Sequence, residues 1–182
     1  MKKLSITGIT IVLTLMSALF LPATIRAQED SQQKIMDDSK KAKEEFEKAD
    51  PSMKHLFNNS YGYVIFPNVG KGAVGVGGAA GRGTVYEKGK TIGTAHMTQV
   101  TAGAQAGGEA YREVIFFESK DALERFTHNK IEFSAETSAI VVKSGASADA
   151  NYRNGVVVFS QGKAGVMVDV SLGGQKFTYK PL

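Results

Sequence analysis

The sequence contains no cysteine. This absence excludes disulfide bonds, thiolate metal sites, cysteine nucleophiles and the acylated cysteine of a lipoprotein. Histidine is scarce, and His55, His96 and His128 fall in three separate predicted elements without an i, i+4 partner. We therefore expect no metal site and no cofactor. For His96 we expect a partly buried side chain that forms hydrogen bonds.

The motifs of nucleotide-binding and hydrolase sites are missing as well. GVGGAA, from Gly75 to Ala80, fits a dinucleotide-binding fingerprint, but the glycines that follow it cannot form the helix that such a site needs. There is no G-x-x-x-x-G-K-[ST] and no G-x-S-x-G. No enzyme class is indicated, so we expect a non-enzymatic protein. Some acidic residues could be combined into catalytic carboxylate pairs, but nothing in their spacing favours this. We expect surface positions for all four: Glu109, Glu113, Asp121 and Asp169.

A long apolar run without charge occurs at the start of the chain. Lys2 and Lys3 precede the run from Leu4 to Leu21, and Ala27 offers a small residue for cleavage. This layout predicts a signal peptide over residues 1–27, with a retained N-terminal anchor as the alternative. The rest of the chain has 19 basic and 18 acidic residues, so its charge gives no evidence for a nucleic-acid partner.

The first part of the expected mature chain, residues 28–58, is predicted to be helical. From Glu29 to Asp50 the apolar residues follow a helical spacing, with a charge-balanced opposite side. Pro51 interrupts this helix, and Asp50 is the expected N-cap of a short second helix to about Asn58. Because the charges balance, we expect the apolar stripe to pack on the domain rather than on lipid. Residues 28–58 and 59–182 are predicted to form one globular unit.

The stretch from Tyr61 to Gly93 carries glycine at a density that excludes a helix. Its β-branched and aromatic residues favour a pleated surface, and its glycines permit turns, bulges and close backbone approach. We predict three or more short antiparallel strands here. Nine of its glycines fall between positions 70 and 93: Gly70, Gly72, Gly75, Gly77, Gly78, Gly81, Gly83, Gly89 and Gly93.

The remainder of the chain is predicted to be mainly β. Ser119 is the expected N-cap of a short helix, and residues 145–154 are predicted to be a loop. The fold class is therefore α+β: a highly curved antiparallel sheet or barrel, flanked by the N-terminal amphipathic helix and the short internal helix. The expected strands lie in residues 91–108, 109–118 and 139–142, and in a final meander of 156–159, 165–172 and 175–179.

Isolated basic residues stand beside the glycine-rich turns. Lys71, Arg82, Lys88 and Lys90 are the candidate contacts for a phosphate head group, if the turns bring them to one rim. The alternative is that these lysines and arginines only confer solubility. Further basic residues occur elsewhere, at Arg112, Lys143 and Lys163.

Three ordered segments resemble the SYLF domain family. They are YGYVIFPNVGKGAVGVGGAAGRGTVYEKG, QAGGEAYREVIFFESKDALERF and GVMVDVSLGGQKF, which together span about Tyr61 to Tyr179. The resemblance implies an α+β domain that binds phospholipids, and in some fungal members actin filaments. It singles out Lys71 and Arg82, inside the first segment, as head-group contacts. Gln161 departs from the family, in which a basic residue is common at that position.

The resemblance and the signal peptide together imply an exported protein of the bacterial cell envelope, periplasmic or extracellular and peripheral to a membrane. Its expected partner is an anionic phospholipid membrane. We expect no actin partner, because an exported bacterial protein does not meet actin. Two alternatives stay open: a structural module that binds an envelope protein, and a carrier of one lipid in an apolar cavity.

Overall fold

A computed structural model describes residues 21–74, 76–102, 107–131, 133, 138–163 and 170–182. The expected signal peptide, residues 1–27, lies mostly outside these ranges. The chain divides into two units between Lys34 and Ile35, and the sheet belongs to the unit from Ile35 to Leu182. The predicted division at residues 27 and 58 stays a prediction.

The described helices are close to those expected. Helix α2 spans Leu21–Ala49, α3 spans Met53–Asn59 and α4 spans Lys120–Thr127. Ser119 caps α4 as predicted, because its hydroxyl oxygen accepts a hydrogen bond from the Ala122 amide at 3.3 Å. The prediction of Asp50 as the N-cap of α3 was wrong. A turn with bonds from Met53 to Asp50 and from Lys54 to Pro51 precedes the helix, so the cap position falls on Ser52.

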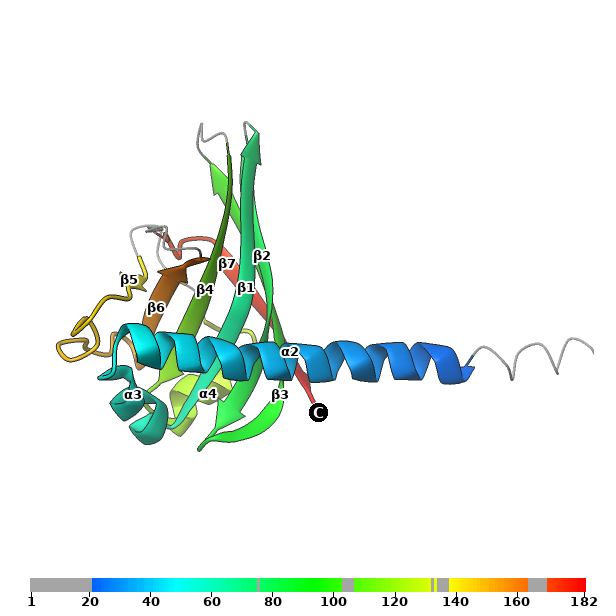
Figure 1. Cartoon of the computed structure of the whole chain (residues 1–182), viewed down its shortest axis with the longest axis horizontal. Helices are drawn as coiled ribbons and strands as arrows, with labels where there is room; N and C mark the ends of the chain where they lie inside the picture. Colours follow the sequence, from blue (N-terminus) through cyan, green and yellow to red (C-terminus); the bar gives the residue numbers. More distant parts are fainter. Residues whose placement is uncertain (1–20, 75, 103–106, 132, 134–137, 164–169) are drawn as a thin grey trace, which may run out of the picture. The chain divides into compact units, whose positions relative to one another are not determined.

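Seven strands form one open sheet in the order β5-β6-β4-β1-β2-β3-β7 (Figure 1). The sheet is not closed into a barrel. All neighbouring strands are antiparallel except β5 and β6, which are parallel. The strands are β1 (Gly62–Val74), β2 (Val76–Glu87), β3 (Lys90–Ala102), β4 (Gly107–Phe117), β5 (Ile140–Val141), β6 (Val156–Gly162) and β7 (Gln175–Pro181).

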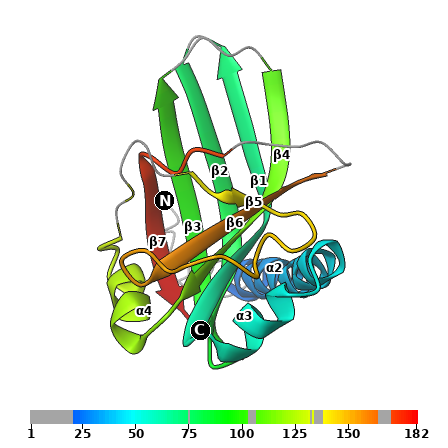
Figure 2. The same cartoon turned by 90° about the vertical axis from the view of Figure 1, so that its left-hand side faces the viewer.

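Two features of the strands differ from expectation. The glycine-rich stretch forms long strands, of 13 residues in β1 and 12 in β2, rather than short ones. The predicted final meander was also wrong, because β6 pairs with β4 while β7 pairs with β3. The middle strand expected at 165–172 falls largely outside the described residues. Figure 2 shows β6 running obliquely to β1, β2 and β3, as in a strongly curved sheet.

Apolar clusters cover both faces of the sheet, which we name after the helices packed on them. On the α4 face, Val64 and Phe66 of β1 pack with Phe126 of α4. On the α2 face, Tyr63 and Ile65 pack with residues of α2 and α3. The Val114–Phe117 segment of β4 contributes to both clusters and is fully buried, which is typical of a strand with a continuous apolar run.

Helix α2, from Ile35 onwards, crosses only the lower half of the long strands (Figure 1). Ser39 fixes this crossing: its hydroxyl donates to Thr84 Oγ1 at 2.9 Å and approaches the Ile65 carbonyl oxygen at 3.4 Å. The upper half of β1, β2, β3 and β4 extends past the helix. Within the described residues, none of the helices combines the length and the apolar character needed to cross a membrane.

Candidate functional site

A row of polar residues crosses the α2 face directly above helix α2. Arg82 of β2 lies opposite Asn68 of β1 on one side and opposite His96 of β3 on the other. His96 in turn lies opposite Thr178 of β7, and Arg112 of β4 lies beside the irregularity at Asn68. We call Arg112, Arg82 and His96 the basic row. It spans three strand spacings, or about 14 Å.

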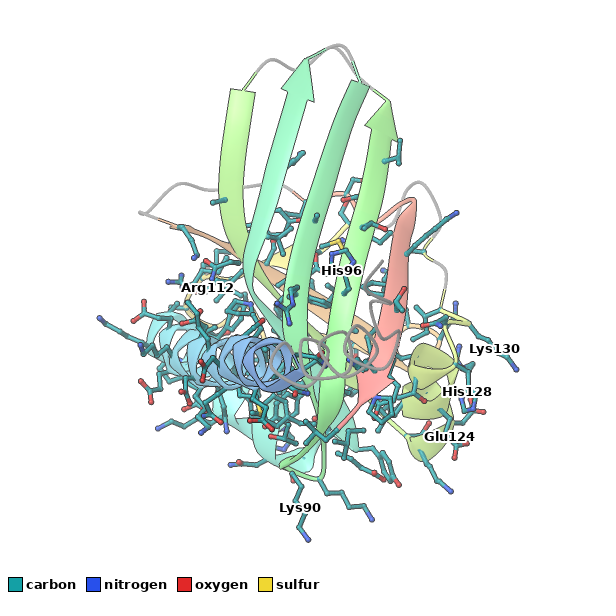
Figure 3. The ribbon with its side chains drawn as sticks, turned by 90° about the vertical axis from the view of Figure 1, so that its right-hand side faces the viewer. Lys90, His96, Arg112, Glu124, His128 and Lys130 are labelled. Atoms are coloured by element: carbon teal, nitrogen blue, oxygen red, sulfur yellow. The ribbon has the colours of Figure 1, made fainter. Side chains whose placement is uncertain are left out.

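The alternation along the strands places the basic row on the α2 face. On β2, Val85 packs on the α4 face and Thr84 bonds to Ser39 of α2, so Arg82, two residues from Thr84, shares the face of Thr84. On β3, Ala95 and Met97 are buried on the α4 face, and His96 between them is exposed. Figure 3 shows Arg112 and His96 on this side of the sheet. The expectation of a partly buried His96 was therefore wrong, because α2 crosses below it.

Gln161 holds Arg112 in place. Arg112 Nη1 donates a hydrogen bond to Gln161 Oε1 at 3.3 Å, and Gln161 Nε2 donates to the Glu45 carbonyl oxygen of α2 at 3.4 Å. The glutamine that departs from the family pattern thus joins the basic row to the helix below. Local sequence patterns do not indicate this link, because the three residues are far apart in the chain.

Above the basic row, the α2 face of β1, β2 and β4 carries mainly glycine and alanine. The next positions upward on β1 are Gly70 and Gly72, and a Cβ added at either would meet no atom within 4 Å. This glycine and alanine patch is completed by exposed or half-buried neighbours: Gly78, Ala80 and Ala110. Lys176 of β7 and Val100 of β3, a residue that is 74% exposed, border the patch. The face therefore combines basic side chains with a surface of glycine and alanine.

The four basic residues predicted as head-group contacts do not share one rim. Lys71 lies on the α4 face, two residues beyond buried Val69, whereas Arg82 lies on the α2 face. Lys88 lies in the exposed turn between β2 and β3, and Lys90 begins β3 at the lower end of the sheet (Figure 3). Lys71 is nine residues along β1 from Gly62, which adjoins that turn, or roughly 30 Å.

Comparison with known proteins agrees with the family resemblance. A family described as Ysc84, Las17-binding protein actin regulator, matches residues 98–181. The chain carries a SYLF domain. This SYLF chain is also similar to the beta cell expansion factor A of Aeromonas veronii, with 30% identity over 129 residues. The alignment covers 70% of this chain and 49% of that protein, so the chain spans about half the length of this relative.

SYLF domains are known for lipid binding and for actin regulation. The matched region begins at Thr98 and includes β4, α4, β6 and β7. It therefore contains Arg112 and Lys176, whereas Arg82 and His96 of the same face precede it. Sequence reasoning selected Arg82 from the glycine-rich segment, and its role as a head-group contact stays a prediction; Arg112 stood only among the further basic residues, and His96 and Lys176 had no site role. Only the strand register brings these residues together.

Proposed function

We propose that this SYLF protein is a non-enzymatic phospholipid-binding protein that docks anionic membrane surfaces on the upper α2 face. The observation that carries the proposal is the basic row beneath the glycine and alanine patch. Arginine guanidinium groups form bidentate hydrogen bonds with phosphate, and a surface of bare backbone lets head groups approach the sheet closely. Lys176 supplies a further cation at the side of the patch.

The proposed setting is outside the cytoplasm. Residues 1–27 have the layout of a signal peptide, so the protein would meet its lipid in the cell envelope, periplasmic or extracellular. We do not extend actin regulation to this chain, because an exported bacterial protein has no access to actin. Lipid binding is the part of the family's activity that this setting allows.

Vesicle co-sedimentation tests the proposal with the form that begins at Gln28. We expect this form to pellet with vesicles containing anionic phospholipid, to stay in solution with neutral vesicles, and to bind less at high salt. Reversing two charges in Arg82→Glu with Arg112→Glu should weaken binding by tenfold or more, since each surface cation contributes about 1 kcal/mol at an anionic membrane.

The matched control reverses two charges in the lower turn. Lys88→Glu with Lys90→Glu changes the net charge by the same amount but leaves the upper α2 face intact. It should retain binding. Equal losses of vesicle binding in the two double variants would show that only net charge matters. A wild-type chain that does not bind anionic vesicles would disprove the proposed function itself.

A further inference from the structure

A buried carboxyl group lies on the α4 face of β4. Glu113 has no exposed surface, which contradicts its expected surface position. In the sheet it stands between Phe66 of β1 and Ser160 of β6, and Ser160 is equally buried. The strand alternation that faces Tyr111 and Ile115 toward the α4 cluster also carries Glu113 inward. Such a group needs a partner that compensates for its loss of water.

That partner comes from β7, the strand at the edge of the sheet beyond β1, β2 and β3. Gln175, at the start of β7, is 3% exposed, and its Nε2 donates a hydrogen bond to Glu113 Oε2 at 3.0 Å. In the sheet order β4 and β7 are separated by β1, β2 and β3, so in a flat sheet they would stand about 19 Å apart. The direct contact therefore requires the sheet to curl until its α4 face closes on itself.

The remaining carboxyl oxygen of Glu113 and the side-chain oxygen of Gln175 are both buried acceptors. Glu113 Oε1 and Gln175 Oε1 have no hydrogen-bond partner in the structure, and neither has Ser160 Oγ. A proton on Glu113 Oε1 turns one of the two acceptors into a donor. A carboxylic acid and a primary amide can then form two parallel hydrogen bonds, one from Nε2 to Oε2 and one from Oε1–H to the amide oxygen.

The surroundings favour this protonated form. Burial raises the pKa of Glu113 from 4.5 to about 7, against a smaller lowering by the Gln175 hydrogen bond. Among the described residues, the other titratable side chains on the α4 face of the sheet are Lys71, Glu87, Tyr111 and Tyr179, together with Tyr61, which packs at its lower end and donates a hydrogen bond to Glu87. Lys71 pairs with position 109 of β4, four residues from Glu113, or about 13 Å, so it is no direct counter-ion.

We propose that Glu113 and Gln175 form a protonation-dependent clasp that holds β7 against β4 and keeps the curled sheet closed. When Glu113 loses its proton, a carboxylate oxygen faces an amide oxygen without a donor between them. The clasp then weakens and β7 separates from β4. The inference does not depend on lipid binding, because it concerns only the closure of the sheet.

The absence of cysteine allows a direct distance measurement. Ala110 of β4 and Lys176 of β7 are exposed on the α2 face and can each be replaced by a spin-labelled cysteine. Between pH 6 and pH 8.5 we expect the label distance to lengthen or broaden. With Glu113→Gln, which keeps a neutral side chain of the same shape, the distance should stay short at both pH values.

Amide hydrogen exchange of the unlabelled chain checks the same opening. After correction for intrinsic base catalysis, the β7 amides should exchange on the order of tenfold faster at pH 8.5 than at pH 6. Glu113→Gln should abolish this change, and Glu118→Gln, which removes an exposed carboxylate at the end of β4, should not. A wild-type chain without pH dependence in either measurement, or a Glu113→Gln chain that still opens, would overturn the clasp.

Discussion

Asp50 joins two distant segments of the chain through one carboxylate. Its Oδ1 accepts hydrogen bonds from the Ser52 amide and hydroxyl and from the Gly145 amide, and its Oδ2 accepts from the Ser147 amide at 2.8 Å. The residue is 1% exposed. Burial by itself raises the pKa of Asp50, but these hydrogen bonds outweigh burial and lower the pKa from 3.8 to about 2.

We expect Asp50→Asn to lower the free energy of unfolding at pH 7 by about 2 kcal/mol. The amide keeps one acceptor oxygen, but its NH₂ group replaces the oxygen that serves one of the backbone donors. Chemical denaturation at pH 7 measures the effect. Asp149→Asn, an exposed acid in the same loop, is the control, and an equal loss there would argue against the specific role of Asp50.

For single residues, the sequence predicts positions at helix ends better than it predicts hydrogen-bond partners. Ser119 was recognised as a cap because its partner is three residues away. Asp50 was recognised as a helix-boundary residue, but its partners at Gly145 and Ser147 lie 95 and 97 residues along the chain. The usual preference of acids predicts a surface position for Glu113, since nothing near it in the sequence indicates Gln175.

Among the elements, β1 and β2 pack so closely that one glycine admits no side chain. A Cβ added at Gly83 would lie 2.5 Å from the Ile65 carbonyl oxygen and 2.8 Å from Phe66 Cδ1. The nearest atom belongs to the backbone of the next strand and cannot rotate away. The sequence-based expectation that glycine permits close backbone approach applies at this position.

Gly83→Ala should destabilise the protein by about 1–3 kcal/mol, because the two strands must move apart. Thermal denaturation followed by circular dichroism provides the measurement. Gly70→Ala, on the open part of the α2 face, places the same methyl group where no atom lies within 4 Å. It should leave the melting temperature nearly unchanged, and similar losses in both variants would contradict this explanation.

The sequence predicted most elements but not the order of the last strands. Periodicity and composition located β3, β4, α4 and the loop after residue 145, because these signals are local. The short turns between the final strands predict a meander. Instead, Phe177 of β7 packs against Phe66 and Phe126, so burial on the α4 face determines where β7 joins the sheet.

For the whole molecule, two buried carboxyl groups make the free energy of unfolding depend on pH in opposite directions. Folding lowers the pKa of Asp50 to about 2, so the unfolded chain binds more protons between pH 2 and 3.8 and stability rises with pH there. Folding raises the pKa of Glu113 to about 7, so the folded chain binds more protons between pH 4.5 and 7 and stability falls with pH there.

We therefore expect maximal stability between about pH 4 and 5, with losses of about 2 kcal/mol on the acid side and about 3 kcal/mol toward pH 8. Urea denaturation from pH 2 to 9 measures this profile. Asp50→Asn should flatten the acid limb and Glu113→Gln the neutral limb. A profile that is flat between pH 4.5 and 8 would contradict the assignment to Glu113.

The two outer strands determine how such an open sheet behaves in a crowded solution. An exposed edge offers unpaired amides and carbonyls on which another chain can add a strand. Here one edge is β5, which is only two residues long, and the other is β7, which carries Lys176, Lys180 and Pro181. Both are poor templates for edge-to-edge aggregation. A protein with long glycine-rich strands can therefore stay dispersed at high concentration.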